Sequence, residues 1–357
     1  MKTKILYYSF ALFLLMIVLS GCASGMTPSS WAGVSTDGPT AYVALASHVY
    51  AVQVSNGVEQ WRYPAKADAK ISFYAAPTIT PDGQLIVGGY NRVLYSLSPK
   101  NGSVNWTFEG AKDRWIGSAA IGNGMIFAPS TDYNLYALDM KGKLLWKYTA
   151  GQALWSQPVV DTKRVYFGSL DHFVYALDMT TSKPDKAAWS TKLDGSILGS
   201  LTLGKDGILY AGTLGGSIYA LDSATGKIKW QHSLSSWIWS GPTVDGSGNL
   251  FASDQAGKMF SLAADSGKEN WSVQPDGPIL GSPLVLENSI VFGTESGSLV
   301  SVGFDNKTLW TKTITGKLYG TPVLAGTSIL VAPLGGDATL IAFDQNGVQQ
   351  WVYTPAK

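Results

Sequence analysis

Eight tryptophans recur at a nearly fixed spacing along the 357-residue chain, and this period limits the fold more than any other feature. Successive members of the set stand 39 to 45 residues apart. The set consists of Trp61, Trp106, Trp146, Trp189, Trp230, Trp271, Trp310 and Trp351. A period near 40 residues predicts a repeat architecture, in which similar units stack to bury a shared core. Residues that recur in every unit are therefore expected to be structural.

Each repeat has the pattern of four short antiparallel strands. In the fifth repeat, apolar residues alternate with small or polar ones over 208–212 and 217–222, and a third run leads to Trp230. Gly, Asp, Asn and Ser bound these runs, which is typical of strands joined by tight turns. We expect no helix after the N-terminal segment.

The turn before each tryptophan has a constant chemistry. Four residues before each tryptophan stand Gly57, Gly102, Gly142, Asp185, Gly226, Gly267, Asn306 and Gly347. Gly, Asn and Asp tolerate positive φ better than other residues. The pattern predicts a hairpin loop with a left-handed residue and a bulge in every repeat.

The start of each repeat predicts a crowded innermost strand. Five repeats have a proline there, at Pro77, Pro158, Pro242, Pro283 and Pro322, and proline suits the edge of a sheet. The residue two positions earlier, or its equivalent, is always small: Ala32, Ala75, Gly117, Ser156, Gly199, Ser240, Gly281 and Gly320. Small side chains fit strands that converge on an axis. The sequence thus predicts an all-β protein, an eight-bladed β-propeller of four-stranded antiparallel blades over residues 31–357. Which termini share a blade stays open at this stage.

The tryptophan motif resembles that of a known propeller family. The string Ala-Leu-Asp-x-x-Thr-Gly-Lys-x-x-Trp, complete from Ala220 to Trp230, is similar to the tryptophan-docking repeat of the pyrroloquinoline quinone (PQQ) propellers. The resemblance covers 31–357 and implies that the eight tryptophans are structural docking residues that pack against the next blade. The family contains quinone-dependent dehydrogenases and a non-enzymatic class, the BamB-like lipoproteins of outer-membrane β-barrel assembly.

The N-terminus predicts export and lipid attachment. Lys2 and Lys4 precede an apolar run over 5–19, which is too short to be a clear membrane-spanning helix. The run ends in Leu19-Ser20-Gly21-Cys22, which resembles a bacterial lipobox, and Cys22 is the only cysteine. We predict a signal peptide over 1–21, a lipidated Cys22 with a tether over 22–30, and the propeller after it. A plain signal peptide with a chance cysteine is the alternative.

Composition and motifs argue against most chemistry. Only 14% of residues are charged and the formal net charge is +1, so no basic stripe predicts nucleic-acid binding. His48, His172 and His232 lack the spacing of metal ligands. Asp139, Asp178, Asp222 and Asp344 end third strands, where a carboxylate accepts backbone N–H groups in a turn. The quinone enzymes of the family carry an adjacent cysteine pair and a calcium site. This chain has one cysteine and therefore lacks such a pair, so we expect no bound quinone despite the resemblance. We expect no catalytic residue and no metal site.

One aromatic set suggests a ligand site. Large apolar residues stand three positions before each proline equivalent, where the chain enters the innermost strand. The candidate residues for a channel mouth are Trp31, Tyr74, Trp115, Trp155, Trp237, Trp239 and Tyr319. Lys70, Asp113, Arg114 and Lys317 are charged neighbours that can supply polar contacts. Simple packing between inner strands is the competing interpretation.

The first hypothesis for function is a non-enzymatic, membrane-anchored scaffold that binds envelope proteins, with a β-barrel assembly component as the concrete partner. It predicts a location at the bacterial cell envelope, on the periplasmic side of the outer membrane if the cell has two membranes and otherwise at the cell surface. A small PQQ-dependent dehydrogenase and a surface module that binds a ligand at the aromatic mouth are the alternatives.

Overall fold

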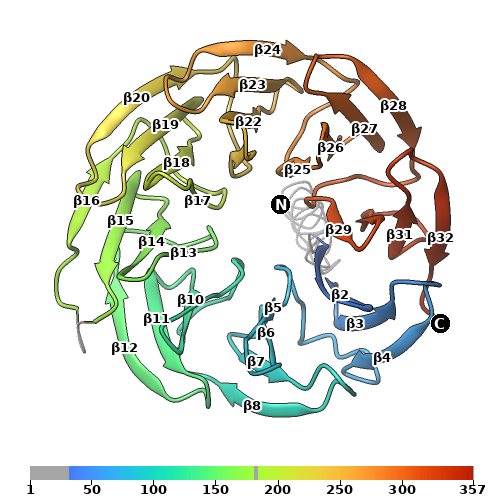
Figure 1. The fold of residues 1–357 in the computed structure, drawn as a ribbon. Coiled ribbons are helices and arrows are strands. Elements are labelled where there is room, and N and C mark those ends of the chain that lie inside the picture. Colours follow the sequence, from blue (N-terminus) through green and yellow to red (C-terminus); the bar gives the residue numbers. More distant parts are fainter. Residues whose placement is uncertain (1–31, 181–183, 357) are drawn as a thin grey trace, which may run out of the picture.

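The computed structural model describes residues 32–180 and 184–356, and within these ranges all regular secondary structure is β-strand. The strands form eight sheets, each of four strands paired in chain order, and Figure 1 shows the sheets arranged as blades around one axis. The predicted eight-bladed β-propeller is therefore confirmed. We number the blades 1 to 8 from the N-terminus.

The strand bounds follow the repeat closely. Blades 1 to 4 contain β1 (Gly33–Asp37), β2 (Thr40–Leu45), β3 (His48–Gln53), β4 (Glu59–Tyr63), β5 (Thr78–Ile79), β6 (Leu85–Gly88), β7 (Leu94–Leu97), β8 (Val104–Phe108), β9 (Ala120–Gly122), β10 (Met125–Pro129), β11 (Asn134–Asp139), β12 (Leu144–Thr149), β13 (Val159–Val160), β14 (Arg164–Gly168), β15 (Phe173–Asp178) and β16 (Trp189–Lys192). Blades 5 to 8 contain β17 (Thr202–Leu203), β18 (Ile208–Gly212), β19 (Ser217–Asp222), β20 (Ile228–Ser233), β21 (Thr243–Val244), β22 (Asn249–Ser253), β23 (Met259–Ala263), β24 (Glu269–Val273), β25 (Leu284–Val285), β26 (Ser289–Gly293), β27 (Ser298–Gly303), β28 (Thr308–Thr313), β29 (Val323–Ala325), β30 (Ser328–Val331), β31 (Leu340–Phe343) and β32 (Gln349–Tyr353).

The predicted hairpin before the tryptophan forms in seven blades. A positive φ occurs at Gly57, Gly102, Gly142, Gly226, Gly267, Asn306 and Gly347, and the strand pairing shifts at a bulge in the same seven blades. The prediction is wrong for blade 4. There the connection between β15 and β16 spans 179–188, and the pairing runs without a shift from Phe173–Lys192 to Ala176–Trp189. A longer connection needs no tight turn at Asp185.

The tryptophans join each blade to the next. Seven of them donate an indole hydrogen bond of 2.8–3.1 Å to a carbonyl in the following blade: Trp61 to Pro99, Trp106 to Met140, Trp189 to Ser223, Trp230 to Ala264, Trp271 to Phe304, Trp310 to Gln345 and Trp351 to Val54. Trp146 packs with Leu177 and Met179 of blade 4. The indole rings rest on the glycine turns, and a Cβ on Gly102 would lie 2.5 Å from the Trp61 ring. Two features therefore favour glycine in these turns: the backbone has a positive φ, and the indole ring leaves no space for a Cβ atom.

The innermost strands approach one another as closely as the small-residue pattern predicts. A Cβ on Gly199 would lie 2.3 Å from the backbone of Ser240 in the next blade. One on Gly281 would lie 2.8 Å from the Gly320 carbonyl oxygen, and one on Gly320 would lie 2.7 Å from that of Ala32. A larger side chain at these positions has no space, so the residue size sets how tightly the blades converge.

The hydrophobic core lies between the blades. Eight clusters of buried side chains are present, and each contains residues from two successive blades. The last cluster joins blade 8 to blade 1, with Leu340 and Tyr353 beside Val43 and Tyr50. Every inter-blade contact therefore buries apolar surface, which is the main source of stability for a ring of this kind.

The ring closes without a shared strand. Each blade comes from one continuous stretch of chain, which answers the question that the sequence left open. In Figure 1, β32 lies next to β4, and here the Tyr353 hydroxyl donates to the Glu59 carboxylate, which also binds Arg62 at 2.6 Å. The Arg62 guanidinium in turn donates to the Ala356 carbonyl. Among the described residues, each hydrogen bond between the first and last blades has a side-chain donor, and no strand pairing crosses the seam.

Candidate functional site

The meander within each blade gives the ring two different faces. The connections between blades and the turns between second and third strands lie on one face, called here the connector face. Backbone hydrogen bonds tie these two kinds of loop together, as from Tyr90 to Ser72, Thr131 to Arg114 and Gln255 to Trp237. The opposite face carries the turns beside the docking tryptophans, where shallow depressions occur around Trp106, Trp230 and Trp351. Because these depressions recur at the joints between blades, we attribute them to the architecture.

The aromatic residues predicted for the channel mouth are placed in three ways on the connector face. Tyr74, Trp155, Trp239 and Tyr319 are half-buried at equivalent positions in blades 2, 4, 6 and 8. Trp237 is 55% exposed, whereas Trp115 is only 1% exposed and packs in the core between blades 2 and 3. Trp31 lies outside the described residues. The set is therefore not one surface, and Trp115 has no exposed ring face for a ligand.

The displacement of Trp115 has a simple cause in the repeat. The residue just before the mouth position is buried in each blade from 2 to 8: Phe73, Trp115, Leu154, Ile197, Ile238, Ile279 and Leu318. Trp115 occupies this core position, and Ile116 occupies the mouth position of blade 3. An offset of one residue in an extended segment turns the side chain to the other side.

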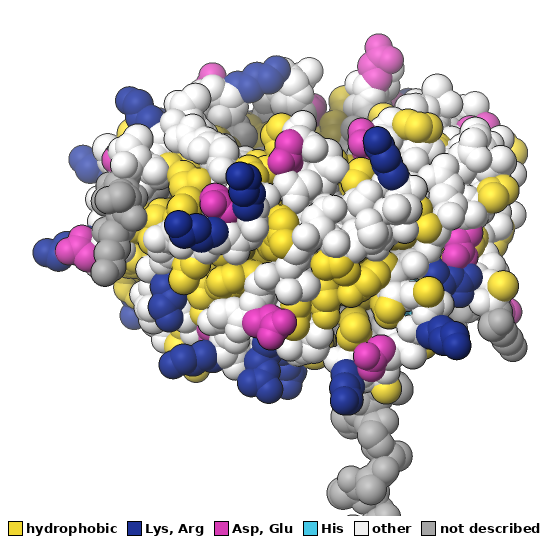
Figure 2. Space-filling view, turned by 90° about the horizontal axis from the view of Figure 1, so that it is seen from below, with side chains coloured by type: hydrophobic (Ala, Val, Ile, Leu, Met, Phe, Trp, Pro, Cys, Tyr) yellow, Lys and Arg dark blue, Asp and Glu magenta, His cyan; other side chains and the backbone are white. Residues whose placement is uncertain are grey.

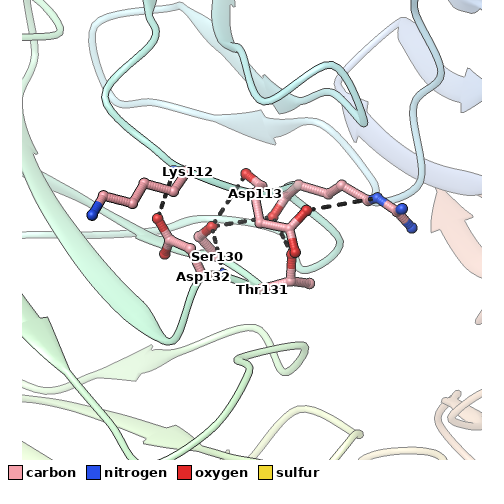
Figure 3. A network of polar contacts seen from close by, with 6 residues as sticks. Lys112, Asp113, Ser130, Thr131 and Asp132 are labelled. Carbon is pink, nitrogen blue, oxygen red and sulfur yellow. Dashed lines mark hydrogen bonds and ion pairs between the residues drawn. The ribbon is translucent and has the colours of Figure 1, made fainter.

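The loops of the connector face are held by acidic side chains. Figure 3 shows this for blade 3, where the backbone N–H of Lys112 donates to Asp132 at 2.8 Å and Ser130 and Thr131 reach the carbonyl groups of the same connection. Burial alone would raise the pKa of Asp132, but hydrogen bonds led by that from Tyr136 outweigh it and lower the pKa. In blade 4, Asp171 binds Gly151 N–H and the Tyr175 hydroxyl in the same way. These carboxylates order loops and are not arranged as a catalytic pair.

The acids that end third strands act in turns. Asp139, Asp178, Asp222 and Asp344 each accept a backbone N–H from within the following two to four residues. The three histidines lie apart, His48 in blade 1, His172 in blade 4 and His232 in blade 5. Within 32–180 and 184–356, no group of three or more His, Cys, Asp or Glu is placed to hold a metal ion. With only one cysteine in the sequence, the residues do not fit a quinone and calcium centre.

Two positions at the mouth combine an aromatic ring with a cation. The Lys317 amine lies 5.7 Å from the centre of the Tyr319 ring and forms an ion pair of 2.6 Å with Glu295. Between blades 2 and 3 of the propeller, the Arg114 guanidinium lies over the Tyr90 side chain, which stacks on Tyr74. The sequence pattern predicts Tyr74 and Arg114 at the mouth but not Tyr90, because a single tyrosine in a turn carries no repeat signal.

The outer wall of the ring carries an exposed apolar region. Large apolar side chains that are 41–56% exposed stand on or just before the outermost strands of six blades. Blades 5 and 7 have one each, Ile228 and Leu309. The remaining set spans four successive blades, 8, 1, 2 and 3. We call this set the apolar arc: Val348, Val352, Val58, Val104, Leu144 and Leu145. Figure 2 views the ring from the side of β4, β8 and β12, and apolar side chains form a band across this view with Lys and Arg along its borders. Extended exposed apolar patches are typical of protein interaction surfaces.

The described segments include no helix of the length and hydrophobicity needed to cross a lipid bilayer.

Among solved structures, the fold is similar to the computationally designed Ika8 protein, with a TM-score of 0.74 and 13% identity over 92% of this chain and 98% of that one. It is also similar to BamB from Moraxella catarrhalis, with a TM-score of 0.70 and 18% identity over 90% of this chain and 96% of that one. At these identities the likeness supports the fold alone.

Sequence comparison adds the family. Outer membrane protein assembly factor BamB from Nitrosomonas eutropha (strain DSM 101675 / C91 / Nm57) is 25% identical over 223 residues, which are 60% of this chain and 52% of that protein. The match thus spans about half the length of this relative. The sequence model of the family described as outer membrane protein assembly factor BamB matches residues 23–232, 215–303 and 287–356. The chain therefore belongs to the BamB family of PQQ-like β-propellers.

Proposed function

We propose that this protein is a non-enzymatic scaffold that binds proteins of the bacterial envelope and assists the assembly of outer-membrane β-barrels. Membership of the BamB family supports the process, and the apolar arc supports the mode of action. A scaffold needs a solvent-exposed surface that is not already buried in intramolecular contacts. The outermost strand of each blade has one unpaired backbone edge, and in blades 8, 1, 2 and 3 this edge is flanked by exposed apolar side chains.

The chemistry of the arc favours a partner that offers a β-strand. Exposed edge strands are usually protected by charged side chains, above all lysine. Such lysines are present on the outermost strands of blades 3, 4, 5 and 7, at Lys147, Lys192, Lys229 and Lys312. The outermost strands of blades 2 and 8, β8 and β32, contain no charged residue. A partner strand added there gains main-chain hydrogen bonds and apolar contacts together.

The partner surface is tested by co-purification from gently solubilised envelopes. We expect the tagged protein to retain a barrel-assembly component, identified by mass spectrometry, and Val104→Glu with Leu145→Glu to lose it, because charge opposes burial of the arc. The matched control is Ile228→Glu with Leu309→Glu, which places the same charges on blades 5 and 7 outside the arc. Equal retention by both double variants, or recovery of no assembly component, contradicts the proposal.

The location of the protein rests on its N-terminus, which lies outside the described residues. We propose that 1–21 are removed as a signal peptide, that Cys22 is lipidated, and that 22–30 tether the propeller to the membrane. In a cell with two membranes, the site is the periplasmic side of the outer membrane. Attachment through two or more acyl chains is stable, so we expect the membrane location to depend on lipidation of Cys22.

Replacement of the lipid acceptor is therefore expected to release the protein. Cys22→Ser should move it from the membrane fraction to the soluble fraction, measured by ultracentrifugation of lysed cells. Ser29→Ala changes the tether without removing the thiol and should leave the protein with the membranes. Retention of Cys22→Ser in membranes after an alkaline wash would show that the attachment is of another kind.

A further inference from the structure

Two stacked tyrosine rings and an arginine, called here the stack, lie together on the connector face between blades 2 and 3. The Tyr74 and Tyr90 rings lie 4.5 Å apart at 21°, and the Arg114 guanidinium carbon lies 4.8 Å from the centre of the Tyr90 ring. Tyr90 therefore contacts both the Tyr74 ring and the Arg114 guanidinium, and the three groups form one cluster.

The backbone beneath this stack is fixed. The Arg114 carbonyl accepts hydrogen bonds from Thr131 N–H at 3.0 Å and from the Ser130 hydroxyl at 3.2 Å. The Tyr90 N–H donates to the Ser72 carbonyl at 2.8 Å, which holds Tyr90 against the preceding connection. Figure 3 shows the same connection held through Lys112 and Asp132. Groups that are ordered before binding lose little conformational entropy when a ligand arrives.

The guanidinium retains binding capacity. The Arg114 side chain is 53% exposed, and its nearest carboxylate oxygen, on Asp113, lies 3.7 Å from Nε, beyond hydrogen-bonding distance. At the corresponding place beside Tyr319, the Lys317 amine lies 2.6 Å from Glu295, which also accepts the Tyr319 hydroxyl at 2.9 Å. Burial, followed by contact with Tyr74, raises the pKa of Tyr90 to about 12, although a hydrogen bond with Arg114 and its charge oppose the shift, so the hydroxyl stays neutral in the physiological range. Arg114 therefore gives the stack a positive charge that its neighbours only partly balance.

We propose that the Tyr74–Tyr90–Arg114 stack binds a carboxylate of an extended peptide, with an aromatic side chain of that peptide beside Tyr74. A guanidinium matches the planar carboxylate with two parallel hydrogen bonds, which makes arginine the suitable cation. Tyr74 is half-buried, so part of its ring stays available to an aromatic neighbour. The carboxylate can come from an acidic side chain or from a free C-terminus. This site is separate from the apolar arc and does not depend on it.

The test uses the full-length protein in detergent and three fluorescein-labelled pentapeptides, each containing one tyrosine. The first has an aspartate beside the tyrosine and an amidated C-terminus, and the second has asparagine in place of the aspartate. The third has the asparagine and ends at the tyrosine with a free carboxylate. We expect the first or the third to bind at least about tenfold more tightly than the second, measured by fluorescence anisotropy. Whichever of the two binds identifies the source of the carboxylate.

The variants assign the preference to the stack. Arg114→Gln should abolish the difference between the peptides, and Arg114→Lys should reduce it, because an ammonium cannot make the paired contact. Tyr74→Leu should weaken the binding of the preferred peptide while keeping its preference for a carboxylate. Lys307→Gln removes one exposed cation from blade 7 and should change nothing. Equal binding of all three peptides, or a preference that survives in folded Arg114→Gln, overturns the proposal.

Discussion

Replacing Trp61 by alanine is expected to lower the free energy of unfolding by about 3–5 kcal/mol, the usual cost of such a truncation in a core. The Trp61 side chain is buried, and its indole donates a 2.8 Å hydrogen bond to Pro99 in the next blade. Its loss removes apolar contact at the joint between blades 1 and 2 and leaves the carbonyl without its donor. The measurement is equilibrium unfolding in urea, followed by near-ultraviolet circular dichroism.

Trp237→Ala is the matched control for this substitution. It deletes the same side chain from a site that is 55% exposed, so it should change the free energy of unfolding much less.

The docking contact can also be tested by substitution of the glycine on which the indole ring rests. Gly102→Ala and Gly83→Ala impose similar strain, at φ of 70° and 76°, but only the Cβ at Gly102 meets the Trp61 ring. The Gly102 variant should therefore be less stable by at least about 1 kcal/mol. Equal losses for the two glycine variants would show that the ring contact contributes nothing.

The second large effect is expected at the seam between blades 8 and 1. Glu59→Gln should lower the free energy of unfolding by about 3 kcal/mol, because the amide keeps one acceptor oxygen and loses the charge that strengthens three hydrogen bonds, each worth about 1.5 kcal/mol or more. Glu59 accepts from Arg62 at 2.6 Å within blade 1 and from the Tyr353 hydroxyl of blade 8. Glu287→Gln is the control, since Glu287 is exposed in the turn between β25 and β26. Similar unfolding curves for Glu59→Gln and Glu287→Gln would show that Glu59 does not stabilise the contact between blades 8 and 1.

The seam should also make the ring sensitive to acid. Burial alone would raise the pKa of Glu59, but the hydrogen bonds from Arg62 and Tyr353 outweigh it and lower the pKa below 4.5. The stability from Glu59 is thus complete above pH 4.5 and disappears as the pH falls through the lower value of the folded state. Burial and the charge of Arg62 lower the pKa of His48 below 6.5, so protonation of this side chain also favours unfolding below pH 6.5. Unfolding free energies measured across this range should fall in both windows, and Glu59→Gln should lack the lower one.

The repeat made most of the fold predictable, because each feature was present several times. The tryptophan spacing, the glycine turn and the small residues of the inner strands each have one local cause, and each was repeated around the ring. Where a blade departs from the repeat, the sequence was misleading. Asp185 aligned with the turn glycines, but the connection of blade 4 is longer and needs no bulge. Trp115 resembled a mouth residue, yet it occupies the neighbouring core position.

The sites were less predictable because they combine residues that have no common pattern. The stack joins Tyr74, Tyr90 and Arg114 from three separate loops, and only the assembled ring brings their planes together. The contact of Glu59 with Tyr353 spans 294 positions of sequence. The apolar arc is visible only when exposure is known, since Val104 and Leu145 in strands look like ordinary core residues.

The continuous blades also mean that the chain has no topologically required starting point. Every hydrogen-bonded sheet is made from one stretch of sequence, and Ala356, which follows the last strand, accepts a hydrogen bond from Arg62 of the first blade. A circular permutation that linked the ends of the propeller and opened it between two other blades would leave all eight sheets uncut. By the same reasoning, duplication or deletion of one repeat would add or remove a whole sheet without cutting any other.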